Sequence, residues 1–183
     1  MKILVKSRQW MTNQLQKDPN WFFNKNIISI FSSGDISPFP DRFNVLKLNF
    51  DDISERDIPV GWNIFDSATK ENIFFNEDHA KQIKDFISEI PADSTKTFYI
   101  HCDAGVSRSG AVGYLLNEYF NKYLANNSED YKFFQIHNSH VMPNPLVVRL
   151  LKLALFGKPF SNIEVNDYEY NEDGEKIDHI EKI

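Results

Sequence analysis

Four short apolar runs along the chain predict buried strands. They are KILVKS at 2–7, NIISIF at 26–31, NVLKLNF at 44–50 and TFYI at 97–100. The second run is β-branched and nearly all apolar, which is typical of a strand covered on both faces. Serine, glycine and proline in the segment that follows it predict a loop. The chain therefore contains the strands of one sheet with a buried centre.

Apolar residues at helical spacing predict helices between and after these strands. Proline follows two of these segments and ends each of them. The expected helices are 8–17, 76–90, a helix whose apolar face runs from Ala111 to Phe120, and a last helix that starts at Pro145. Alternating strands and helices predict an α/β fold, in which helices flank a central, mostly parallel sheet.

The length of 183 residues fits one domain, which we assign to residues 1–160. The remaining segment, 161–183, holds eight acidic residues and two lysines. It forms either a solvated acidic tail or a hairpin that turns at 171–174. Polar residues alternate with apolar or aromatic ones in YEY and KIDHI, which favours the hairpin.

Composition excludes several classes of protein. The hydrophobic share of 42% and the charged share of 25% are ordinary for a globular protein. A net charge of −6 argues against nucleic acid or an anionic membrane as a partner. The apolar runs are too short for a transmembrane helix or the core of a signal peptide. Because one cysteine cannot form an internal disulfide, we expect a cytoplasmic location.

The stretch FYIHCDAGVSRSG at 98–110 places the single cysteine, Cys102, between a buried strand and a helix. In open α/β sheets, ligands bind beyond the carboxyl ends of the strands, where a helix N-terminus favours an anion. The turn formed by Asp103, Ala104, Gly105, Val106 and Ser107 is short enough to wrap one phosphate. The planar guanidinium of Arg108 can donate hydrogen bonds to two phosphate oxygens at once. The sequence thus predicts a phosphate-binding loop with a nucleophilic thiolate, to which Ser109 can donate a hydrogen bond.

The stretch HCDAGVSRSG resembles the His-Cys-x5-Arg-Ser/Thr signature of the cysteine-dependent protein tyrosine phosphatases, in particular their compact dual-specificity type found also in bacteria and phages. A Pro-Asn pair precedes the last helix in that family, and Pro143–Asn144 matches it here. The resemblance covers about residues 26–156. It implies that Asn144 braces the phosphate loop and that His101 supports the loop from behind, holding its carbonyls in register.

The resemblance implies phosphoryl transfer in two steps. The Cys102 thiolate attacks phosphorus and forms a phosphocysteine, and water then hydrolyses this intermediate. Backbone N–H groups and Arg108 neutralise the phosphate oxygens, so no metal and no cofactor are expected. No cluster of metal ligands is visible in the sequence; the other histidines are scattered, at His79, His137, His140 and His179.

The general acid of this family is an aspartate on a loop after an upstream strand. Asp51 and Asp52 directly follow the strand at 44–50, and Asp52 matches the family position better. The segment between this pair and Cys102 is longer than is usual for the class, so Asp57 and Asp66 remain alternatives. We predict Asp52.

A phosphorylated protein or peptide is the expected substrate, with phosphotyrosine first and phosphoserine or phosphothreonine as further candidates. Asp103 and Val106 stand where phosphoinositide-selective relatives carry lysines, which makes inositol phosphates less favourable. The alternatives are an inactive phosphate-binding module, a rhodanese-related enzyme, and an RNA or nucleotide 5′-phosphatase. The Pro-Asn pair and Gly105 disfavour the rhodanese-related class, and the acidic composition disfavours RNA.

Overall fold

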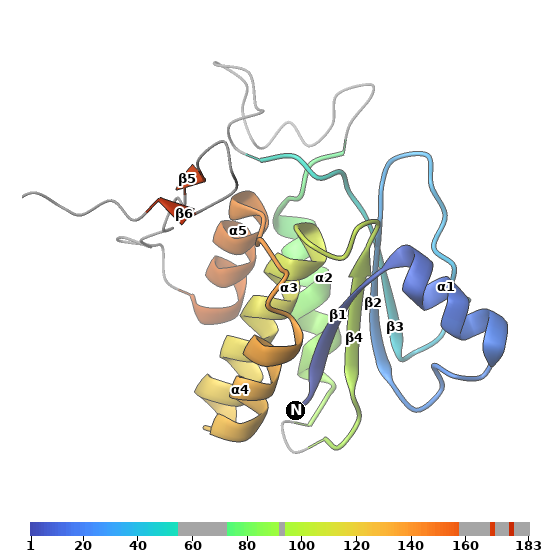
Figure 1. Ribbon diagram of the computed structural model, residues 1–183, viewed down its shortest axis with the longest axis horizontal. Helices are drawn as coiled ribbons and strands as arrows, with labels where there is room; N and C mark the ends of the chain where they lie inside the picture. Colours follow the sequence, from blue (N-terminus) through green and yellow to red (C-terminus); the bar gives the residue numbers. More distant parts are fainter. Residues whose placement is uncertain (55–72, 92–93, 158–168, 171–175, 178–183) are drawn as a thin grey trace, which may run out of the picture.

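The computed structural model describes residues 1–54, 73–91, 94–157, 169–170 and 176–177. The predicted strands form a four-stranded sheet in the order β1-β4-β2-β3, and every neighbouring pair is parallel (Figure 1). Their bounds are β1 Ile3–Ser7, β2 Asn26–Phe31, β3 Val45–Asn49 and β4 Phe98–Cys102. The predicted α/β class is therefore confirmed, with a sheet that is wholly parallel.

The strand register places the carboxyl ends of all four strands at one edge of the sheet. Ser7 pairs with Cys102, Ser29 pairs with His101, and Phe31 pairs with Asn49. All four strands consequently end at nearly the same level. The segments that follow them meet at this edge, which lies at the top of the sheet in Figure 1.

Helices cover both faces of the sheet (Figure 1). One face carries α1, Arg8–Lys17, over a small cluster of Met11, Phe22, Ile27 and Phe39. The larger core lies on the other face, under α2 Glu77–Ser88, α3 Arg108–Leu116, the π-helix η2 Asn117–Leu124, α4 Ser128–His137 and α5 Pro145–Phe156. In β2, Ile27 faces the small cluster and Ile28 faces the large core, which confirms that this strand is covered on both sides.

Capping groups explain where the helices begin and end. Ser7 accepts a hydrogen bond from the backbone of Trp10 at the start of α1, at 3.2 Å. Asn144 accepts one from the backbone of Val147 at the start of α5, at 3.2 Å, and Pro145 occupies the first turn. Gly157 ends α5 with a φ of 65°. The sequence predicted both helices from the spacing of their apolar residues, and the last one also from Pro145.

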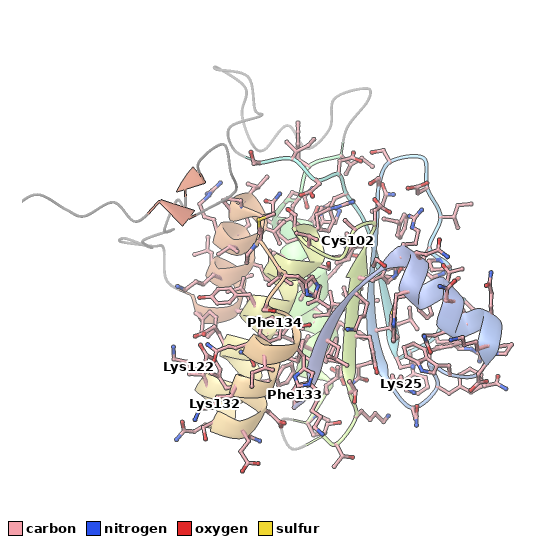
Figure 2. All side chains as sticks on the ribbon, in the orientation of Figure 1. Lys25, Cys102, Lys122, Lys132, Phe133 and Phe134 are labelled. Carbon is pink, nitrogen blue, oxygen red and sulfur yellow. The ribbon has the colours of Figure 1, made fainter. Side chains whose placement is uncertain are left out.

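Two features of the helical face were not predicted. The helix predicted through Phe120 does continue past Leu116, but it does so as the π-helix η2, and α4 is an additional helix. Gly113 lets α3 pack closely, since a Cβ there would lie 2.6 Å from Val5 Cγ2 and 3.2 Å from Phe134 Cε2. Figure 2 shows Phe134 beside β1, at the point where α4 meets the sheet.

Near the end of the chain, β5 (Glu169–Tyr170) pairs antiparallel with β6 (Lys176–Ile177). The two arms of the predicted hairpin are thus present, while its turn at 171–174 falls outside the described residues. In the described part of the chain, no helix combines the length and the apolar character needed to cross a membrane.

Candidate active site

The loop from Asp103 to Ser107 joins the end of β4 to the start of α3. Gly105 has a φ of 77°, and a Cβ at this position would lie 2.5 Å from the backbone carbon of Lys6. Glycine is therefore required, both for the positive φ and for the close approach to β1. The first N–H groups of α3 have no partner within the helix, so this turn is an anion-binding geometry.

Cys102 ends β4 at the edge where the loops meet (Figure 2). The residue is only 2% exposed. Its Sγ accepts a hydrogen bond from the Gly105 N–H at 3.3 Å and lies 3.1 Å from Ser109 Oγ. Both groups can donate to a sulfur anion, as the sequence predicted for Ser109. The thiol therefore sits at the base of the loop with two donors directed at it.

Arg108 is 4% exposed and held by three hydrogen bonds. Nη1 donates to Ser32 Oγ at 2.9 Å and to the Phe50 carbonyl at 2.8 Å, and Nη2 donates to Asp103 Oδ2 at 2.6 Å. Nε is buried and has no hydrogen-bond partner among the described residues. Three of the five guanidinium donors are used in these bonds. The edge that carries Nε is therefore the one that can bind an anion.

Asp52 lies over this loop. Its Oδ1 accepts hydrogen bonds from Ser107 Oγ at 2.7 Å and from Asn144 Nδ2 at 2.9 Å. Asn144 also braces the loop through its backbone N–H, which donates to the Ser107 carbonyl at 3.3 Å. The side chain of Asp52 is exposed, so it can reach a substrate at the loop. Asp52 and Asn144 are thus joined to each other and to Ser107, the last residue of the loop that follows Cys102.

Asp51 has a different environment. Its carboxylate accepts hydrogen bonds from the backbone and hydroxyl groups of Ser33 and from the Ile73 N–H at 2.8 Å. Burial raises the pKa of Asp51, but these bonds and the charge of Arg108 outweigh burial and leave the pKa below its ordinary value. Donors thus engage both carboxylate oxygens of Asp51 and tie the loops after β2 and β3 together, which favours a structural role for Asp51. The alternatives Asp57 and Asp66 fall outside the described residues.

His101 lies behind the site, between β4 and β2. Its Nε2 lies 2.8 Å from Ser29 Oγ, which in turn lies 2.7 Å from Ser37 Oγ. The ring also interacts with the backbone of Cys102, where the loop begins, and this interaction opposes the effect of burial on its pKa. That the imidazole holds the loop carbonyls in register stays a prediction. Burial lowers the pKa of His101 to about 4, so the ring is neutral at pH 7.

The lowered pKa of His101 predicts that acid destabilises the fold before the carboxylates titrate. The unfolded chain binds a proton near pH 6.5, whereas the folded chain binds it only near pH 4, so stability falls as the pH falls between these values. Between pH 7.5 and pH 5, we expect His101 to remove about 2 kcal/mol from the free energy of unfolding. Urea unfolding of His101→Gln should lack this part of the pH dependence. An unchanged pH slope in that variant would contradict the assignment.

Several residues of the site were not predicted. Ser32 and the Phe50 carbonyl hold Arg108, Ser33 holds Asp51, and Arg8 contacts the loop through its backbone N–H, which donates to the Asp103 carbonyl at 3.1 Å. All of them follow strand ends, which is the one signal that could have found them. Within the described residues, no group of three or more histidine, cysteine, aspartate or glutamate side chains could hold a metal ion.

No protein-family model matches this chain, and no curated protein matches its sequence. Among solved structures, a PTP-2 phosphatase of Cydia pomonella has 17% identity and a TM-score of 0.49, with 83% of this chain and 84% of that chain covered. A human tyrosine phosphatase-like serine/threonine/tyrosine-interacting protein has 19% identity and a TM-score of 0.44, with coverage of 82% and 88%. OH1 of the Orf virus, a tyrosine phosphatase, has 13% identity and a TM-score of 0.43, with coverage of 86% and 84%. These similarities are too distant to assign a function.

Proposed function

We propose that this chain is a cysteine-dependent phosphatase that hydrolyses phosphomonoesters without a metal ion. One observation carries the proposal. A buried thiol with two directed donors, a buried guanidinium with an unpartnered Nε, and an exposed carboxylate converge on a single glycine-containing loop. A nucleophile, an anion clamp and a proton donor are the three groups that phosphate-ester cleavage through a covalent intermediate requires.

In the first step, the phosphate occupies the loop and faces Nε of Arg108. The Cys102 thiolate forms a bond to phosphorus as the bond from phosphorus to the ester oxygen breaks. Asp52, held above the loop by Ser107 and Asn144, gives its proton to the departing oxygen. The products are an alcohol or phenol and a phosphocysteine, and Asp52 is left ionised.

In the second step, a water molecule replaces the departed alcohol. Asp52 now accepts a proton from the water, whose oxygen attacks phosphorus while the bond to sulfur breaks. The sulfur leaves as a thiolate, to which the Gly105 N–H and the Ser109 hydroxyl donate hydrogen bonds. Inorganic phosphate is released, and the acid is protonated again for the next turnover.

The substrate class proposed is a phosphorylated protein or peptide in the cytoplasm, with phosphotyrosine before phosphoserine and phosphothreonine. The carboxylate of Asp103 is 41% exposed at the loop. It disfavours polyanions such as inositol phosphates, whose additional phosphates would lie near a like charge. The net charge of −6 likewise disfavours RNA 5′-ends.

Phosphatase activity is expected to persist in excess EDTA and to be inhibited by vanadate, which occupies the site of the transferring phosphoryl group. The test is hydrolysis of a panel of phosphopeptides, nucleotides and inositol phosphates, with and without each reagent. Comparing the rates for phosphopeptides and nucleotides also distinguishes a protein phosphatase from an RNA or nucleotide 5′-phosphatase. If EDTA abolishes turnover while vanadate has no effect, the mechanism is wrong, and if no member is hydrolysed, the chain is a phosphate-binding module.

A further inference from the structure

Asp103 places a carboxylate inside the loop that is to bind a phosphate, which is electrostatically unfavourable. Its Oδ2 accepts hydrogen bonds from Arg108 Nη2 at 2.6 Å and from Ser32 Oγ at 2.9 Å. Its Oδ1 lies 3.2 Å from Arg8 Nε, and Arg8 Nη1 lies 3.1 Å from Asp35 Oδ2. A chain of alternating charges therefore runs from Asp35 through Arg8 and Asp103 to Arg108.

These contacts fix the orientation of the guanidinium. Ser32 Oγ accepts from Arg108 Nη1 and donates to the same oxygen, Asp103 Oδ2, that accepts from Nη2. The bonds to Ser32 and Asp103 therefore lie together on the guanidinium edge between Nη1 and Nη2. The adjacent edge, formed by Nε and the other hydrogen of Nη2, carries the donors that these bonds leave unused, and Nε is buried without a partner among the described residues. Two parallel N–H groups on one edge match two oxygens of a phosphate.

We propose that Asp103 is a positioning residue, which holds Arg108 so that the edge with Nε is presented to the phosphate. This inference rests on the proposed function, in which Arg108 is the phosphate clamp. Without Asp103, Nη2 loses its acceptor and Ser32 loses the group that it donates to, so the guanidinium can rotate toward other acceptors. The cost appears as weaker binding of the phosphate group and slower turnover.

Two effects of Asp103 oppose each other, and the contacts decide between them. Its negative charge repels a phosphate, but the carboxylate is 41% exposed and Arg8 lies against it, so water and Arg8 screen this repulsion. Its hydrogen bond to Arg108 joins two charged groups, and Arg108 is only 4% exposed. Hydrogen bonds between charged groups are stronger than those between neutral groups. Burial raises the pKa of Asp103, yet the bonds from Arg108 and Ser32 and both arginine charges keep the pKa below its ordinary value.

The test measures vanadate affinity by calorimetry, together with kcat and KM for an aryl phosphate, in the full chain. Asp103→Ala is expected to weaken vanadate binding about tenfold and to lower kcat by a similar factor. The isosteric Asp103→Asn should lose less, because its amide oxygen can still accept from Arg108 and Ser32. Asp35→Asn is the matched control, since Asp35 pairs with Arg8 rather than with Arg108. This control should stay within about twofold of the unchanged chain.

A double-mutant cycle separates positioning from a merely structural role. In an Arg108→Ala background, Asp103→Ala should no longer weaken vanadate binding and should instead strengthen it slightly, because only the repulsion remains. Tighter vanadate binding by Asp103→Ala in the unchanged chain would overturn the proposal, as would an equal loss in both backgrounds. Vanadate binding needs no turnover, so absent activity would refute the proposed function while this test still decides the role of Asp103.

Discussion

Cys102→Ser is expected to abolish turnover and to leave the binding of an oxyanion such as sulfate largely intact. The serine hydroxyl is a far weaker nucleophile than a thiolate, so the loss in kcat should be on the order of 10⁴-fold or more. The binding groups stay in place, because Gly105 and Ser109 can hydrogen-bond an oxygen at this position and Arg108 is untouched. Since vanadate can bond to the nucleophile itself, sulfate or tungstate competition is the cleaner measure of binding.

Arg108→Lys is the matched contrast. A lysine keeps the charge but replaces a planar edge with one point donor, and it cannot reproduce the three bonds to Ser32, Phe50 and Asp103 at once. We therefore expect this variant to lose oxyanion binding as well as turnover. Equal losses of binding in Cys102→Ser and Arg108→Lys would contradict the division of roles between thiol and guanidinium.

Asp52→Asn is expected to slow the hydrolysis of a phosphopeptide by about 10²- to 10⁴-fold, and that of an activated aryl phosphate far less. A general acid matters most when the departing oxygen is strongly basic, and little when the leaving group is already a stable anion. Asparagine can still accept the bonds from Ser107 and Asn144, so the loop should keep its position. The basic side of the pH–rate profile should flatten in this variant.

Asp51→Asn is the control for this assignment. Asp51 accepts bonds from Ser33 and Ile73, so its replacement should lower stability without any dependence on the leaving group. Asp57→Asn and Asp66→Asn should likewise show no such dependence. If Asp66→Asn alone slows the phosphopeptide selectively, Asp66 is the general acid, and the assignment of Asp52 is wrong while the reaction class is unaffected.

The sheet and most helices could be predicted because their signals are local. Residues 26–31 are nearly all apolar, and Pro145 marks the first turn of α5. Helix α4 was missed because its apolar residues form no single stripe. Phe134 is buried while Ile136, two residues later, is 70% exposed. Its start depends on Asn127, whose side chain accepts from the backbone of Glu129 and Asp130.

Within the site, the sequence predicted the groups that one motif brings together, and it missed those that topology brings together. Cys102, Gly105 and Arg108 lie within seven residues, so their meeting follows from a single turn. Two of the three partners of Arg108, Ser32 and Phe50, come from the ends of two other strands, and no local pattern marks them. The contact of His101 with Ser29 was missed for the same reason, since Ser29 belongs to a neighbouring strand.

The most direct test of the covalent mechanism is to look for the phosphocysteine. The Asp52→Asn variant should be mixed with an activated aryl phosphate and quenched in acid within the first turnovers, because slowed hydrolysis lets the intermediate accumulate. Mass spectrometry of the digested protein should then find one phosphoryl group on the peptide that contains Cys102, and none in the Cys102→Ser variant. Turnover with no phosphoryl group on Cys102, or with the group on another residue, would contradict the mechanism.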